Sequence, residues 1–161
     1  MTDLEKVKKN GSALMYVKYQ TSEICLAAVE QNGLALDYVK NQTPNICLAA
    51  VKEDGWSLKF VKNQTREICL AAVEQNGWAL QFVKNQIPEL CLAAVKEDGW
   101  ALQFVKNKTP EICLAALEQD DSTLEFIPLD LIKETLGLAI KPEIENKNYR
   151  KCNRFDLMDI D

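Results

Sequence analysis

A six-residue apolar segment that returns every 22 residues constrains the fold of this chain more than any other feature. Near-identical segments at a fixed spacing are typical of repeat proteins, in which each unit packs chiefly on its neighbours. The sequence therefore predicts a linear stack of similar units. The segment reads ICLAAV at Ile24–Val29, Ile46–Val51 and Ile68–Val73, LCLAAV at Leu90–Val95, and ICLAAL at Ile112–Leu117.

Each unit carries start and stop signals for a helical hairpin. Thr43 followed by Pro44 is typical of a helix start, with a hydroxyl N-cap and then proline at the first helical position. Glu67 places negative charge in the first turn of its helix, where the helix dipole favours it. In the segment after each glycine, such as WALQFVKN, apolar residues are spaced by three and four, which indicates a second helix of about eight residues. We expect left-handed glycines to end the first helix at Gly33, Gly55, Gly77 and Gly99.

Helices this short are marginal in isolation, so the hairpins must stack to bury their apolar faces. We therefore predict an all-α fold, an α-solenoid of short helical hairpins with a 22-residue period that is capped at both ends. Polar replacements early in the chain and a final helix predicted at Leu131–Ile140 would supply the caps. The predicted parts are an N-terminal capping hairpin (1–20), five tandem repeats (21–127), a C-terminal capping helix (128–141) and a non-repeat tail (142–161).

The repeat pattern ICLAAV-x-x-x-G-W-A-L-x-F-V-K resembles a bacterial and viral repeat family known as domain of unknown function 4116. The resemblance covers roughly residues 10–127. It brings no catalytic residues with it, and tandem copies of this kind imply a binding module.

A cysteine row, with one thiol in each unit, runs along the predicted stack. Six consecutive apolar residues cover nearly every face of a helix, so we expect the ICLAAV helix to be the inner one and its cysteine to be a small buried hydrophobe. Adjacent units would lie about 9–10 Å apart, beyond disulfide reach. A row of metal sites is the alternative, but the chain has no histidine, and we expect no cofactor. The row consists of Cys25, Cys47, Cys69, Cys91 and Cys113.

Two polar rows lie in the last turn of the predicted second helix of each unit. Either they form a solvated helix end, in which lysine complements the dipole and asparagine caps, or they form a recognition stripe for an acidic partner or a phosphate backbone, or they persist from recent duplication. A glutamine row runs beside them, at Gln20, Gln42, Gln64 and Gln86. The lysine row is Lys18, Lys40, Lys62, Lys84 and Lys106, and the asparagine row is Asn41, Asn63, Asn85 and Asn107.

A tryptophan row opens the second helices at Trp56, Trp78 and Trp100. Either the indoles pack over the neighbouring unit, or they stay exposed as an interface. A further row, after ICLAAV, alternates in charge: Glu30, Lys52, Glu74, Lys96 and Glu118. This alternation avoids like-charge contacts and suggests that the ancestral duplicated unit was two hairpins long.

The tail carries a short apolar segment that includes Phe155, Leu157 and Met158. Such a segment either folds back on the last hairpin or docks on another protein. The N-terminus lacks an apolar run of signal-peptide length, and no run approaches the ~20 residues that span a bilayer. We therefore expect a cytoplasmic protein, of the producing cell or of an infected host cell, that does not bind membranes.

Extended surfaces of nearly constant chemistry favour a non-enzymatic protein–protein interaction module, a binder or adaptor for one partner protein of unknown identity. The first alternative is a viral or bacterial inhibitor that blocks a nucleic-acid-handling protein. The second is direct nucleic-acid binding through the lysine row, against which the net charge of −5 argues. No clustered nucleophile, phosphate-binding glycine loop or metal set supports an enzyme. The pattern leaves the oligomeric state open.

Overall fold

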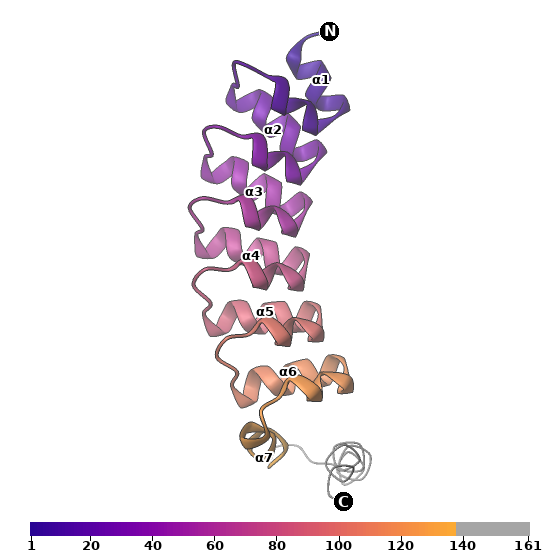
Figure 1. Ribbon diagram of the computed structural model, residues 1–161, viewed down its shortest axis with the longest axis vertical. Helices are drawn as coiled ribbons and strands as arrows, with labels where there is room; N and C mark the ends of the chain where they lie inside the picture. The colour runs from indigo at the N-terminus through magenta and orange to yellow at the C-terminus, as the bar shows by residue number, and fades with distance from the viewer. Residues whose placement is uncertain (138–161) are drawn as a thin grey trace, which may run out of the picture.

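The computed structural model describes residues 1–137, and they form one elongated stack of helical units (Figure 1). The α-helices are α1 (Asp3–Lys9), α2 (Ser22–Gln31), α3 (Pro44–Glu53), α4 (Arg66–Gln75), α5 (Pro88–Glu97), α6 (Pro110–Gln119) and α7 (Leu129–Gly137). The 3₁₀ helices between them are η1 (Gly11–Tyr16), η2 (Gly33–Tyr38), η3 (Gly55–Phe60), η4 (Gly77–Phe82), η5 (Gly99–Phe104) and η6 (Asp121–Phe126). The predicted all-α solenoid is confirmed.

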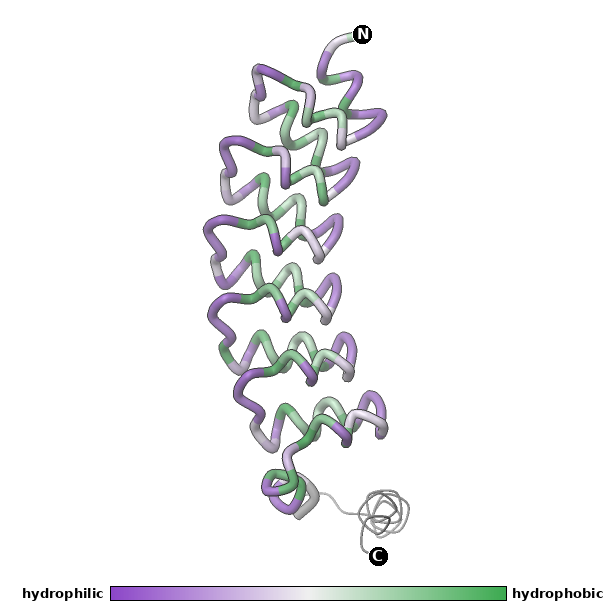
Figure 2. The backbone as a smooth tube through the Cα atoms, viewed as in Figure 1, coloured by the Kyte–Doolittle hydropathy of each residue, from purple (hydrophilic) through white to green (hydrophobic). Residues whose placement is uncertain are grey.

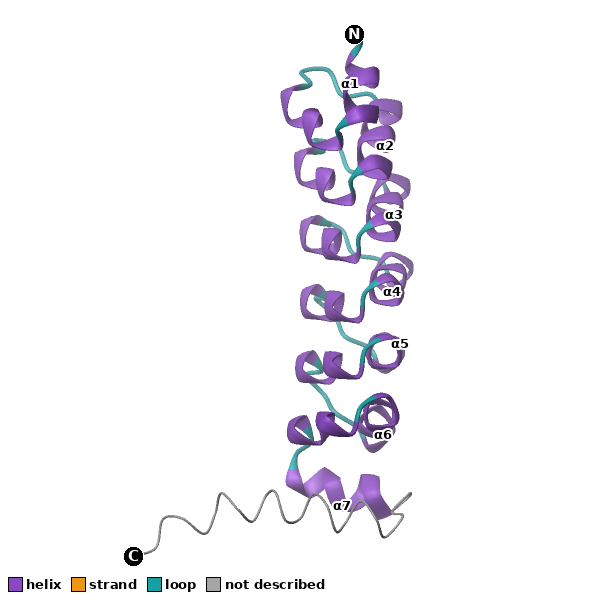
Figure 3. Ribbon diagram, turned by 90° about the vertical axis from the view of Figure 1, so that its right-hand side faces the viewer, coloured by secondary structure: helices purple, strands orange, loops and turns teal. Residues whose placement is uncertain are grey.

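The stack has two layers, with the α-helices in one column and the 3₁₀ helices in the other (Figure 3). Hydrophobic residues lie along the middle of the stack, while the connections at both edges are hydrophilic (Figure 2). In one unit the α-helix buries Ile68, Cys69, Ala72 and Val73, and the 3₁₀ helix buries Ala79 and Leu80. The core is therefore a continuous seam between the layers.

The prediction that the ICLAAV helix is the inner one is wrong. It forms one of two layers, and Leu70 and Ala71 are only half-buried. These two side chains are partly buried and pack against the core. The segment is almost uniformly apolar because each helix contacts the opposite layer and also the helices above and below it.

The predicted starts of the α-helices are confirmed. The Thr65 hydroxyl accepts a hydrogen bond from the Ile68 backbone N–H at 3.3 Å, and Thr21, Thr43 and Thr109 cap their helices in the same way. Ile87 takes the place of threonine at the start of α5 and makes no side-chain cap.

The second helix of each unit is a 3₁₀ helix of six residues, not an α-helix of about eight. Bonds from residue i+3 back to residue i define it, such as Ala79 N–H to Asn76 C=O at 2.9 Å and Val83 N–H to Leu80 C=O at 3.1 Å. An asparagine or aspartate caps its N-terminus, as Asn76 does by accepting from Trp78 N–H. The chain then becomes extended at Val83.

The repeated glycines serve close packing and not left-handed geometry, so that expectation is wrong. No glycine in residues 1–137 has positive φ. The α-helix ends instead at an extended residue, such as Asn76 with φ −156° and ψ 111°. A Cβ added at Gly77 would lie 2.5 Å from the Ala94 carbonyl oxygen of the next unit. Glycine is required because the next α-helix presses its backbone against this position.

Units with the repeat's geometry begin at α1 and η1, in the place predicted for the N-terminal cap. A capping box closes the start of α1, because Thr2 and Glu5 each accept a hydrogen bond from the other's backbone N–H. At the far end α7 packs on α6 and begins at Leu129, two residues before the predicted start. The predicted end of that helix lies outside the described residues.

Candidate functional site

The glutamine row is a structural ladder that ties each unit to the next. The side chain of Gln64 donates from Nε2 to the Phe82 carbonyl at 2.9 Å and accepts at Oε1 from the Lys84 backbone N–H at 3.0 Å. Gln20, Gln42 and Gln86 make the same two bonds to their own next units. These amides are committed to the fold and are not available to a ligand.

The ladder ends where two substitutions coincide. Lys108 stands in the glutamine position, and its Nζ donates to the Val105 carbonyl at 3.1 Å. Pro128 stands in the next lysine position and has no backbone N–H to donate. At the C-terminal end of the stack, the glutamine acceptor and the backbone N–H that would donate to it are therefore both missing.

The lysine row lies on the connections between units, after the 3₁₀ helix and not in its last turn. All five lysines are exposed. The ammonium group of Lys84 donates to the Lys62 carbonyl at 3.0 Å, and Lys62 and Lys40 reach the carbonyl one unit earlier at 3.5 and 3.1 Å. The fold therefore orients these three side chains along the axis of the stack, so that positive charge recurs once per unit.

The asparagine row lies beside the lysine row and is also exposed. The C-cap positions of these 3₁₀ helices are occupied by valines, such as Val61 and Val83, so the expectation that asparagine caps these helices is wrong. The structure gives the four carboxamides no hydrogen-bond partner within residues 1–137. No non-glycine residue in this range has positive φ, and Tyr19 occupies the same position in the first unit. Nothing in the local backbone thus requires asparagine.

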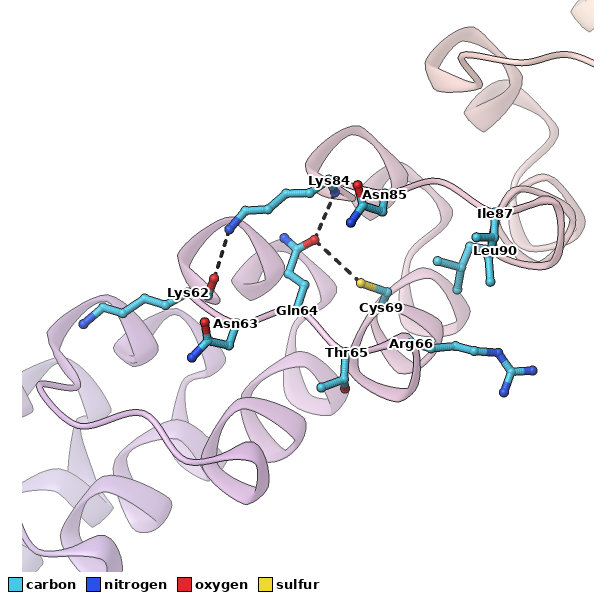
Figure 4. A pocket seen from close by; sticks show the side chains of 10 residues that line it. All are labelled: Lys62, Asn63, Gln64, Thr65, Arg66, Cys69, Lys84, Asn85, Ile87 and Leu90. Carbon is cyan, nitrogen blue, oxygen red and sulfur yellow. Dashed lines mark hydrogen bonds between the residues drawn. The ribbon is translucent and has the colours of Figure 1, made fainter.

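We call the two rows together the loop-edge stripe. It follows the connections between units along one edge of the stack (Figure 1). Near its centre the surface is hollowed into a groove with a volume of about 430 Å³. Figure 4 shows Asn63 and Asn85 in the same orientation, one unit apart, while Gln64 lies between them and joins Lys84 and Cys69. The groove is lined by Lys62, Asn63, Gln64, Thr65, Arg66, Cys69, Lys84, Asn85, Ile87 and Leu90.

Two residues of this groove, Ile87 and Arg66, were not predicted from the sequence. Ile87 is 38% exposed although it is apolar. Arg66 stands where other units have proline or serine, and it forms a bidentate ion pair with Glu89 of the next unit at 2.6 and 2.7 Å. Both residues are exposed, and both differ from the residues at the equivalent positions of the other units. This difference is the sequence signal that could have identified them.

The tryptophan row packs across units. Trp78 meets Phe104 edge-to-face with ring centroids 5.4 Å apart, and its Nε1 donates to Asp98 at 2.6 Å. Trp100 makes the same two contacts with the following unit. Trp56 contacts Phe82, has Asn76 where the others have aspartate, and is 37% exposed.

The five described cysteines are buried free thiols. Burial raises the pKa of each thiol, an effect that Lys84 partly opposes at Cys69. The Sγ atoms of Cys25, Cys47, Cys69 and Cys91 lie 3.7–3.9 Å from the Oε1 atoms of the glutamine row. Each of these thiols therefore donates a weak hydrogen bond to the ladder. Raised pKa values keep the thiols protonated and unreactive at neutral pH.

The alternating row at Glu30, Lys52, Glu74, Lys96 and Glu118 is exposed. It lies near the C-terminal ends of the α-helices, at the edge opposite the loop-edge stripe (Figure 1). The next position alternates between glutamine and glutamate. Gln75 accepts a hydrogen bond from Gly55 N–H at 2.6 Å, and Gln31 accepts one from Gly11 N–H. Units of two kinds therefore alternate along the stack.

Phe155, Leu157 and Met158 of the tail lie outside the described residues. No helix in residues 1–137 is both long enough and apolar enough to cross a membrane.

No curated protein and no solved structure matches the chain. The pattern of one family, described as "Domain of unknown function (DUF4116)", matches twice in tandem, at residues 43–87 and 88–132. Each match spans two hairpins, in agreement with the paired alternation of the units, and together the matches cover more than half of the chain. The chain therefore belongs to the family described as domain of unknown function 4116.

Proposed function

We propose that this protein is a non-enzymatic module that binds an elongated acidic region of a partner protein along the loop-edge stripe. The observation that carries the proposal is the asparagine row. Its side chain is identical in four consecutive units, is exposed, and has no partner within the described residues. An exposed side chain that the fold does not use is available for recognition.

Recent duplication alone does not explain this constancy, because other exposed positions have diverged between the same units. The position before the aromatic residue of each 3₁₀ helix is exposed throughout. It holds Asp37, Lys59, Gln81, Gln103 and Glu125 in successive units. Exposed side chains have therefore been free to change while the asparagines stayed the same.

The lysine row supplies the charge for such a partner. Lys40, Lys62 and Lys84 each add a positive charge one unit after the last, and the bonds to backbone carbonyls restrict their side chains. Restricted side chains lose less entropy on binding, which favours affinity. A row of like charges without acidic neighbours in the row attracts acidic groups and speeds their association.

The test is an affinity capture from native lysate with and without nuclease, in three forms of the tagged full chain: wild type, Lys62→Glu/Lys84→Glu, and the control Lys52→Glu/Lys96→Glu. The control makes the same change in net charge at the opposite edge of the stack. We expect wild type to capture one partner protein in stoichiometric amount, with or without nuclease. The control variant should capture the same protein, and the stripe variant should not. Circular dichroism should show the same helix content in all three forms.

Other outcomes select the alternatives. Loss of all capture after nuclease would overturn the proposal in favour of direct nucleic-acid binding through the lysine row. Capture of a nucleic-acid-handling enzyme together with loss of its activity would specify the inhibitor role. Capture that the stripe variant retains would overturn the assignment of the binding surface.

A further inference from the structure

We infer that the loop-edge stripe takes an extended polypeptide segment, with the asparagines bonded to its backbone and the lysines paired with acidic side chains at every third residue. This inference rests on the proposed function and specifies the conformation and sequence pattern of the bound segment.

A carboxamide fits a peptide backbone because it carries both a donor and an acceptor. The Asn63 and Asn85 side chains each offer an NH₂ group and an oxygen. An extended chain presents backbone N–H and C=O groups that no neighbouring residue satisfies. Since the two carboxamides have the same orientation one unit apart (Figure 4), one extended chain could meet both in the same way. A charged row alone would not need the amide.

The period of the stack agrees with three residues of an extended chain. Packed helices lie about 8–10 Å apart, and α4 packs directly on α5. Three residues of a polyproline II helix advance about 9 Å and bring the chain back to the same face. Each unit therefore meets an equivalent backbone group and an equivalent side chain, and four asparagines would cover about 12 residues.

The lysines then select side chains at the same period. The Nζ atoms of Lys62 and Lys84 lie over the carbonyls of the preceding units, so their spacing is the spacing of the units. Aspartate or glutamate at every third residue of the segment would reach one ammonium group each. Carboxylates pair with such fixed ammonium groups through charge-assisted hydrogen bonds.

The groove adds a preference for one apolar side chain near the middle of the segment. Ile87 and Leu90 form its apolar wall, between Lys84 on one side and Arg66 on the other. A cavity of about 430 Å³ accommodates a large side chain. The central unit is thereby distinguished from its neighbours, which fixes the register of an otherwise repetitive contact.

A nucleic-acid strand suits this stripe less well. Strands are held by stacking of bases on aromatic side chains as well as by charge. Of the five units that carry a lysine of the row, the first has Tyr19 in the asparagine position and the other four have asparagine. The stripe thus offers hydrogen-bonding groups where a strand binder would offer aromatic platforms.

The test is selection from a random library of displayed 16-residue peptides on the full chain. Affinities of the enriched peptides are then measured by fluorescence anisotropy for wild type, Asn63→Ala/Asn85→Ala and the control Gln81→Ala/Gln103→Ala. The control removes two exposed amides that bond within their own unit. We expect acidic residues at every third position and binding to the asparagine variant about tenfold weaker or more, with no change in the control.

The outcomes separate this inference from the proposed function. If Lys62→Glu/Lys84→Glu abolishes binding, but the peptides lack a three-residue period or the asparagine variant binds normally, then the inference fails and the stripe stays the binding surface. If the library yields no binder, or only binders that both stripe variants retain, the inference and the proposed surface fail together.

Discussion

The side chain of Gln64 accepts a hydrogen bond from the backbone N–H of Lys84 at 3.0 Å, across the boundary between two units. The same side chain donates to the Phe82 carbonyl at 2.9 Å and receives the weak bond of Cys69. One amide thus satisfies a backbone donor and a backbone acceptor of the next unit. It also holds the connection that carries Lys84 and Asn85 in place, which links the stability of the stack to the shape of the stripe.

Gln64→Ala should therefore destabilise the protein much more than its partial exposure indicates. The Phe82 carbonyl is partly buried, and a buried polar group that loses its partner costs about 1–3 kcal/mol. Urea denaturation followed by circular dichroism measures the effect. Gln81→Ala is the matched control, because that amide bonds only to Trp78 of its own unit and its loss should cost less than about 0.5 kcal/mol. Equal effects of the two substitutions would contradict the ladder.

Gly77→Ala should destabilise the stack although alanine is the better helix former. Alanine in a helix is favoured over glycine by up to about 1 kcal/mol, whereas forcing a methyl group into a packed site costs about 1–3 kcal/mol. The added Cβ would lie 2.5 Å from the Ala94 oxygen, so the second effect should prevail. The same change at Gly99, where the distance is 2.9 Å, should cost less. Stabilisation by Gly77→Ala would show that the units are not so close.

Trp78→Leu should cost about 1–3 kcal/mol in unfolding free energy, because it removes the edge-to-face contact with Phe104 and the hydrogen bond to Asp98. Trp56→Leu should cost less, since Trp56 is more exposed and the unit after it has Asn76 in the position of Asp98. Acrylamide quenching of proteins that keep a single tryptophan gives an independent measurement. Stronger quenching of Trp78 than of Trp56 would argue that the row is an exposed interface.

The period, the threonine caps and the juxtaposition of equivalent residues were predictable because they depend on local signals and on repetition. Thr43 caps its helix as predicted, and Lys62 and Lys84 lie one unit apart. The 3₁₀ helices were not predictable, because apolar spacings of three and four suit an α-helix equally well over six residues. Only the bonds at Ala79 and Val83 distinguish the two helix types.

The roles of individual residues that recur in every unit could also be identified only from the structure. Gly77 reads as a helix end, but the atom that excludes a side chain there belongs to Ala94 in the next unit. Gln64 reads as one more polar residue of the connection, yet its partners are 18 and 20 residues away. Contacts between units cannot be inferred from the sequence of a single unit. These contacts determine which rows stabilise the fold and which are free for a partner.

The buried thiols predict how stability depends on alkaline pH. Burial raises the folded-state pKa of Cys69 above its ordinary value, so the thiol ionises more readily in the unfolded chain. Its contribution to stability is therefore full below about pH 8.5 and is lost as pH rises through the folded pKa. The unfolding free energy should fall more steeply between pH 8 and pH 10 in wild type than in Cys69→Ala. Parallel curves would contradict burial of the thiol.

Ile87→Thr should stabilise the protein while weakening any binding that uses the groove. Threonine would restore the cap that the other repeat helices have, and α5 lacks any side-chain cap. A threonine cap contributes about 0.5–1 kcal/mol, which a shift of the urea midpoint would report. Thr65→Ile is the reverse control and should destabilise by a similar amount. The same Ile87→Thr protein should bind the selected peptides more weakly, because the apolar wall of the groove is 38% exposed at Ile87 and available to a ligand. Higher stability with unchanged affinity would show that the isoleucine serves neither the fold nor the groove.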